Sequence, residues 1–119
     1  MFKYFDIKEE FLCPCCGGGL DIMKYTFVKK LDNARDIAGV SFNITSGYRC
    51  PLHNAEVGSK PTSSHIRGVA CDIAVKGSVE RFAIVNGLIK AGFTRIGIGK
   101  DFVHVDADYK KSPYVMWMY

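Results

Sequence analysis

The first helical pattern in the chain covers residues 24–38. Its apolar positions recur at spacings of four, three and four, which places them on one face of an α-helix; they are Phe27, Leu31, Ala34 and Ala38. Gly39 follows directly, at a position where glycine commonly ends a helix. We therefore predict a helix that buries this face.

A second helix is predicted over residues 79–90. Ser78 precedes it as a candidate N-cap, and Gly92 follows it. Apolar residues at helical spacing define its expected buried face, namely Phe82, Val85 and Ile89.

Shorter segments favour β-strands. Val40, Phe42 and Ile44 alternate with polar neighbours, which is typical of a half-buried strand. Further strands are expected over 69–75, 95–99 and 102–106, the last two joined by a tight turn at residues 99–101.

The other segments show little periodicity. Residues 1–23 are predicted to be an irregular, cysteine-containing lead-in, and the aromatic tail from Pro113 is predicted to pack on the body. Residues 51–67 are predicted to be a loop with room for one short helix. A structureless loop as long as residues 51–67 is unusual in a small domain unless it forms part of a functional site. The order of elements indicates an α+β domain with a small, mainly antiparallel sheet and two principal helices.

Length and composition exclude several classes of protein. The 119 residues correspond to one domain, 1–119, and a hydrophobic content of 48% excludes disorder as the main state. No apolar run approaches the roughly 20 residues of a membrane span. The net charge of +4 is scattered, so we expect no nucleic-acid partner, and an anionic cell wall suits the charge equally well. We expect a monomer.

The first residues, Met1 to Asp6, are too polar for a signal peptide. We therefore expect synthesis in the cytoplasm without a cleaved leader. Where the protein acts is a separate question that the sequence leaves open.

The five cysteines are Cys13, Cys15, Cys16, Cys50 and Cys71. Their number is odd and too small for a disulfide-built scaffold. Cys13 and Cys16 have the spacing of a metal-binding pair, but no second pair follows, so the spacing does not support a four-cysteine zinc site. Two alternatives stay open: a site of Cys13 and Cys16 completed by Cys50, or thiols that are reduced or joined in disulfides.

The chain has three histidines, His53, His65 and His104, and we interpret His53 as structural. Asp72 lies seven residues after His65, between two alanines on a strand face that we expect to belong to the core. If its strand neighbours that of His104, their side chains start about 5 Å apart. Two imidazoles and a carboxylate form a three-ligand zinc set that leaves one position open for water.

Metal-assisted hydrolysis also needs a proton acceptor that is not a ligand. Asp101 stands three residues before His104 and suits this role if it precedes the strand or lies in a bulge. Asp106 lies on the same strand face as His104 and is the alternative candidate for the proton acceptor. We interpret it instead as a carboxylate that supports the metal ligands.

These residues fall into separated motifs in a fixed order: Ser63-x-His65-x-x-Gly68-x-Ala70-x-Asp72, then Asp101-x-x-His104. Together with the block from Ser46 to Asn54, they resemble the zinc D-alanyl-D-alanine carboxypeptidases and related cell-wall endopeptidases, which share the hedgehog/D-Ala-D-Ala-peptidase fold. The resemblance covers roughly residues 40–106.

The resemblance implies one zinc ion held by His65, Asp72 and His104, with Asp101 as general base. It implies that Arg49 holds the scissile carbonyl oxygen or a substrate carboxylate, and that Ser63 contacts substrate. The implied substrate is the stem peptide of peptidoglycan, cut at D-Ala–D-Ala or at an internal link such as L-Ala–D-Glu. Many members carry tryptophan where this chain has Phe102-Val103, and glycine where it has Ser59, so the cleaved bond stays open.

Three hypotheses of function follow. The first is a zinc metallopeptidase, plausibly a phage-type lysis or wall-entry enzyme (an endolysin), which would act on the wall from the host-cell or periplasmic side. The second is a non-catalytic binding module that keeps the fold and the zinc. The third is a cysteine-centred zinc or redox protein.

Overall fold

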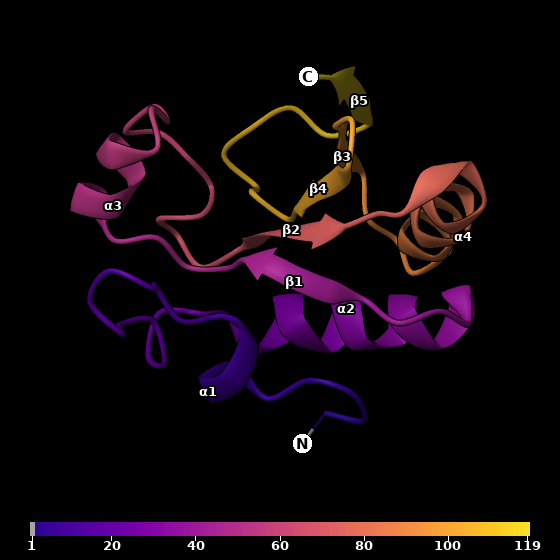
Figure 1. Cartoon of the computed structure of the whole chain (residues 1–119), viewed down its shortest axis with the longest axis horizontal. Coiled ribbons are helices and arrows are strands. Elements are labelled where there is room, and N and C mark those ends of the chain that lie inside the picture. Colours follow the sequence, from indigo (N-terminus) through magenta and orange to yellow (C-terminus); the bar gives the residue numbers. More distant parts are fainter. Residues whose placement is uncertain (1) are drawn as a thin grey trace.

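A five-stranded sheet forms the middle of the computed structural model, which describes residues 2–119 (Figure 1). The strand order is β1-β2-β4-β3-β5. The strands are β1 (Asn43–Ser46), β2 (Ala70–Ala74), β3 (Arg95–Ile98), β4 (Phe102–Asp106) and β5 (Val115–Met118). All neighbours pair antiparallel except β3 and β5, which run parallel. The α+β architecture with a mainly antiparallel sheet is therefore confirmed.

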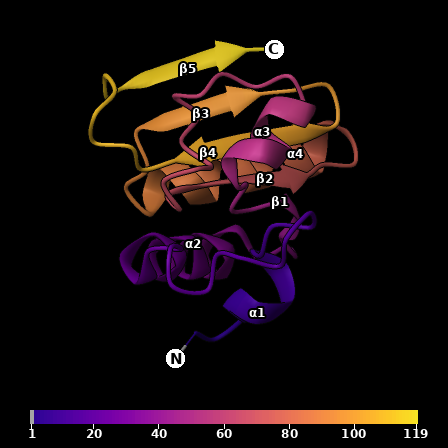
Figure 2. The same ribbon diagram turned by 90° about the vertical axis from the view of Figure 1, so that its left-hand side faces the viewer.

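The helices are α1 (Ile7–Glu10), α2 (Tyr25–Ala38), α3 (Pro51–Glu56) and α4 (Gly77–Lys90). The two long helices, α2 and α4, pack together and contribute to one continuous core with the sheet. The short helix α3 lies on the opposite side of the sheet from α4 (Figures 1 and 2). The sheet thus has a core face and a second face that is open to loops.

The structure confirms the predicted helix at residues 24–38. Phe27, Leu31 and Ala34 are buried, and Gly39 ends α2 in the left-handed conformation that glycine adopts without strain. The short α1 falls within the predicted irregular lead-in, and α3 within the predicted loop.

The predicted buried face of the second long helix is wrong at two of its three residues, since only Val85 packs against the core. Phe82 and Ile89 are 74% and 51% exposed, whereas Ile84 and Leu88 are fully buried. The helix is apolar on more than one side, so two faces satisfy the same spacing, and contact with α2 selects one of them. Ser78 is not the N-cap either: Lys76 takes that position, and its N–H donates to Glu80 Oε1 at 3.0 Å.

The strand face that carries Asp72 is not the core face. Cys71, Ile73 and Val75 point into the core, whereas Asp72 and Ala74 are only half-buried. Both faces of β2 carry apolar residues, so alternation alone could not distinguish them. The correction places Asp72 on the open face of the sheet.

The aromatic tail packs on the body as predicted, and it does so as β5, paired with β3 at the edge of the sheet. None of the helices within residues 2–119 combines the length and apolar character that a bilayer crossing requires.

Candidate active site

Three side chains from separate parts of the chain converge on the open face of the sheet. Asp72 on β2 is the direct cross-strand partner of His104 on β4, and His104 Nδ1 lies 3.0 Å from Asp72 Oδ1. His65 enters from the loop before β2, with Nε2 at 3.5 Å from the same oxygen. All three ligand atoms lie within 4.8 Å of one another.

The orientation of His65 is fixed by the backbone of the segment after β1. His65 is 3% exposed, and its Nδ1 donates to the carbonyl of Gly47 at 2.7 Å. A carbonyl only accepts, so Nδ1 carries the proton. In the neutral imidazole, Nε2 then presents a lone pair to Asp72.

His104 is held in a similar way by Asp106. Its Nε2 lies 2.8 Å from Asp106 Oδ2, and Asp106 Oδ1 accepts hydrogen bonds from Arg95 Nε at 2.6 Å and from the Asp108 N–H at 3.2 Å. When Nε2 donates to Asp106, the lone pair of Nδ1 faces Asp72. Lone pairs of two imidazoles and a carboxylate then meet at one point, which favours a cation there.

The electrostatics of the cluster without a metal follow from the same close contacts. Burial alone would raise the pKa of Asp72, but hydrogen bonds and charge interactions with His104 and His65 outweigh it and hold that pKa well below its usual range. Burial lowers the pKa of His104, and its bonds with Asp106 and Asp72 overcome this effect, so the pKa is raised. Without a metal, the same contacts favour a proton on His104.

Arg49 lies beside the cluster and is largely buried. Its Nη2 is 3.4 Å from Asp72 Oδ2, its Nε donates to Ser46 Oγ at 3.1 Å, and its Nη1 is 3.4 Å from Asn54 Oδ1. Asn54 is itself fixed by the carbonyl of Lys60 at 2.8 Å. The guanidinium is therefore positioned by contacts on several sides.

A cleft of about 320 Å³ opens over these residues. Its lining includes the residues of the cluster, Arg49 and Ser63, together with the basic side chains of Lys60, Lys111 and Arg95 and the aromatic rings of Phe102, Trp117 and Tyr119. The ring of Trp117 lies 5.5 Å from that of His104, centroid to centroid. Trp117 and Tyr119 reach the cleft because the tail pairs with β3.

The other predicted site residues lie as follows. Ser63 Oγ accepts from the His65 N–H at 3.3 Å. Asp101 directly precedes β4, as its proposed role requires, but it is exposed and lines a neighbouring hollow with Asp72 instead of the main cleft. His53 lies on α3, outside the lining of the cleft.

Two close backbone approaches support the loops of the site. Gly68 has φ 70°, and a Cβ there would collide with the carbonyl of Ile22. At Gly47, a Cβ would lie 2.6 Å from Phe11 Cα. Both positions therefore require glycine, and the lead-in packs directly against the segments that carry His65 and Arg49.

Asp108 is a buried carboxylate that sequence reasoning missed. It accepts hydrogen bonds from Ser64 Oγ at 2.8 Å and from Arg67, and so ties the loop of His65 to the loop after β4. Its position in a short Asp-x-Asp run was the only available signal.

Comparison with protein families gives a match to peptidase M15 over residues 3–106. No curated protein sequence matches the chain. The family match spans the lead-in, the sheet up to β4 and all three residues of the cluster. The chain therefore belongs to the peptidase M15 family, the zinc D-Ala-D-Ala carboxypeptidase-like metallopeptidases.

Proposed function

We propose that the protein hydrolyses a peptide bond in the stem peptide of peptidoglycan, either the terminal D-Ala–D-Ala link or an internal link such as L-Ala–D-Glu. One observation carries the proposal: His65, Asp72 and His104 converge at the floor of a cleft in a chain of the peptidase M15 family. A role in lysis of or entry through the cell wall, of the kind phage enzymes perform, fits the same chemistry.

His65 Nε2, Asp72 Oδ1 and His104 Nδ1 are the atoms that would hold one zinc ion. The fit rests on the two ring orientations, since each imidazole is anchored on its far nitrogen and turns the other toward Asp72. When bound, zinc supplies Lewis acidity: it polarises a substrate carbonyl and lowers the pKa of a water toward about 7. The protein's part is to fix the ligands and shape the cleft.

Arg49 is proposed to bind the oxygen of the scissile carbonyl or a carboxylate of the substrate. Its guanidinium lies at the cleft, next to Asp72, and its contacts to Ser46 and Asn54 hold it in place before substrate arrives. A donor positioned in advance stabilises developing negative charge more effectively than a mobile one. Ser63, on the rim near His65, is proposed to contact substrate.

Asp101 is proposed as the general base. Asp106 is the alternative candidate for the general base, but its carboxylate already accepts hydrogen bonds from Arg95 and from the Asp108 N–H and contacts His104. These interactions outweigh burial and lower the pKa of Asp106, which disfavours its taking up a proton. Asp101 is exposed beside Asp72 and its side chain is free to turn toward a bound peptide.

The lining of the cleft suits a short anionic peptide. Lys60, Lys111 and Arg49 place positive charge around the cluster, and the rings of Trp117 and Tyr119 cover apolar parts of a ligand. Stem peptides carry a carboxylate at their end and small apolar D-alanine side chains, which match these two properties.

The test compares zinc-loaded wild-type protein with Asp101→Asn and Asp106→Asn. Each is incubated with a pentapeptide ending in D-Ala–D-Ala and with purified peptidoglycan, and free D-alanine and new amino groups are measured. We expect wild-type activity, and a loss of about 100-fold or more for Asp101→Asn with zinc content unchanged. Inactivity of wild-type protein on both substrates at full zinc occupancy would instead support a non-catalytic binding module.

A further inference from the structure

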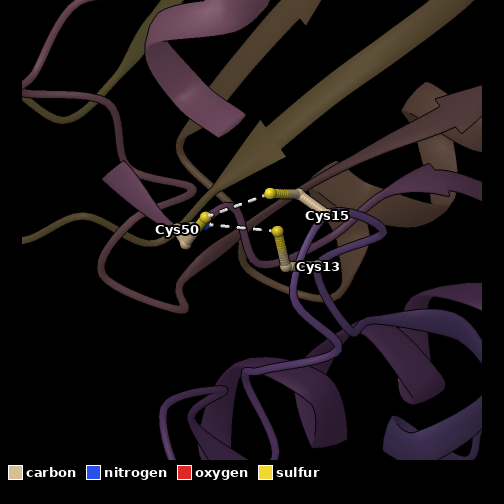
Figure 3. Close-up of side chains that lie close together, drawn as sticks. All are labelled: Cys13, Cys15 and Cys50. Carbon is tan, nitrogen blue, oxygen red and sulfur yellow. Dashed lines mark hydrogen bonds between the residues drawn. The ribbon is translucent and has the colours of Figure 1, made fainter. Parts of the chain in front are cut away.

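A second group of metal-binding side chains lies outside the cleft, where the lead-in meets the segment before α3. Cys13 and Cys15 come from the loop after α1, and Cys50 is the N-cap of α3. Figure 3 shows their sulfur atoms turned toward one another. The three sulfurs lie within 4.8 Å of one another, although Cys15 and Cys50 are far apart in sequence.

The sulfur spacing is close to that of a tetrahedral thiolate site. Zinc binds sulfur at about 2.3 Å, which places tetrahedral sulfur ligands about 3.8 Å apart. Cys50 Sγ and Cys15 Sγ are 4.0 Å apart. Small side-chain rotations would suffice to close the group around one ion.

Backbone N–H groups point at two of these three sulfurs. The Cys50 N–H donates to Cys13 Sγ at 3.5 Å, and the His53 N–H donates to Cys50 Sγ at 3.4 Å. Such donors orient sulfur ligands and stabilise their charge.

Cys16 is the natural fourth ligand. It stands three residues after Cys13 and precedes Gly17, and its sulfur accepts from the Gly18 N–H at 3.4 Å. Its sulfur lies outside the three that converge within 4.8 Å of one another, so Cys16 would have to change its side-chain rotamer to complete the site.

We propose that Cys13, Cys15 and Cys50, with Cys16 as fourth ligand, bind one zinc ion that is structural and separate from the ion held by His65, Asp72 and His104. Disulfides are the competing arrangement, but all of these cysteines are free thiols in the structure. The convergence of the sulfurs and the N–H donors aimed at them favour a metal.

This ion would fasten the lead-in to the segment that supports the active site. Cys50 follows Arg49 directly, and the carbonyl of Gly47 in the same segment accepts a hydrogen bond from His65 Nδ1. Tyr48 N–H also donates to the Phe11 carbonyl at 2.8 Å, so lead-in and segment already form one unit. The metal would stabilise this unit without touching substrate.

The test uses the full chain, reduced, stripped of metal and titrated with Co²⁺ and, in parallel, with Zn²⁺. Thiolate ligands give Co²⁺ a near-ultraviolet charge-transfer absorption that histidine and carboxylate ligands do not give. We expect wild-type protein to show this absorption and to bind two metal ions per chain. We expect the double variant Cys15→Ala/Cys16→Ala, which changes only exposed side chains, to lose the absorption and bind one ion.

Two controls separate this site from the active site. His65→Ala removes a ligand of the other cluster, so it should keep the thiolate absorption while losing one equivalent of metal. Cys71→Ala changes a buried thiol outside the group and should behave as wild type. The proposal is overturned if wild-type protein binds a single ion without thiolate absorption, or if the absorption persists unchanged in the double variant.

Discussion

At the scale of single residues, the site depends on which nitrogen of each imidazole is anchored. Gly47 holds His65 by Nδ1, and Asp106 holds His104 by Nε2, so opposite nitrogens of the two rings turn toward Asp72. We therefore expect Asp106, which is not itself a proposed ligand, to influence how tightly His65, Asp72 and His104 bind a metal ion.

Asp106→Asn tests this dependence. An amide cannot carry the negative charge that now holds His104, so zinc affinity should fall by about 10–100-fold. Competition with a chromophoric chelator measures the affinity, and circular dichroism checks that the fold is kept. Asp36→Asn, which changes an exposed carboxylate paired with Lys3, is the matched control and should leave affinity unchanged. Equal affinities for wild type and Asp106→Asn would contradict the role given to Asp106.

Arg49→Lys tests the guanidinium. Lysine keeps the charge but cannot contact Asp72, Ser46 and Asn54 together, so the positioned donor is lost. We expect kcat/KM on the cleaved stem peptide to fall by about 100-fold, with zinc content unchanged. If the lysine variant retains full activity, a point charge is sufficient and the proposed geometry of oxygen binding is wrong.

At the scale of elements, loops and strands contribute different parts of the site. Register alone brings Asp72 and His104 together, because β2 and β4 pair antiparallel with these residues opposite each other. His65 depends instead on a loop that is tied down by Asp108, whose carboxylate is almost fully buried.

Asp108→Asn should release that loop and lower the free energy of unfolding by roughly 1–3 kcal/mol near neutral pH. Burial raises the pKa of Asp108, but hydrogen bonds from Ser64, Lys110 and Arg67 outweigh it and lower that pKa below its ordinary value of 3.8. The stabilisation is therefore complete above about pH 4 and is lost as the pH falls through the lower pKa of the folded protein. Urea unfolding of both proteins across pH 3–7 should show a difference that shrinks with acid; a constant difference would exclude the carboxylate charge as its source.

At the scale of the whole molecule, the sequence predicted the features that depend on residues close together in the chain. The spacing of Phe27, Leu31 and Ala34 identified α2, and the separated motifs identified the residues that the fold brings together as His65, Asp72 and His104. The buried face of α4 and the open face of β2 depend on which neighbour packs against them, so residue patterns could not decide them. The partners of Asp108 come from loops distant in sequence and left no periodic signal.

The position of the tail at the cleft also depends on tertiary structure. Trp117→Ala tests what the tail contributes to substrate binding. Trp117 packs against the ring of His104 and lies 5.1 Å from the guanidinium of Arg95, and it is not one of the residues proposed to hold the metal. We expect KM for the stem peptide to rise several-fold with zinc content unchanged. Unchanged KM would show that the ring is only a structural cover.

The match to peptidase M15 ends at Asp106, while β5 begins at Val115. The three residues proposed to hold zinc and one wall of the cleft therefore lie in different stretches of the sequence. If the proposed function holds, substitutions in the last residues can change which peptide the cleft accepts while leaving the three proposed ligands in place, so substrate selectivity can evolve separately from the metal chemistry.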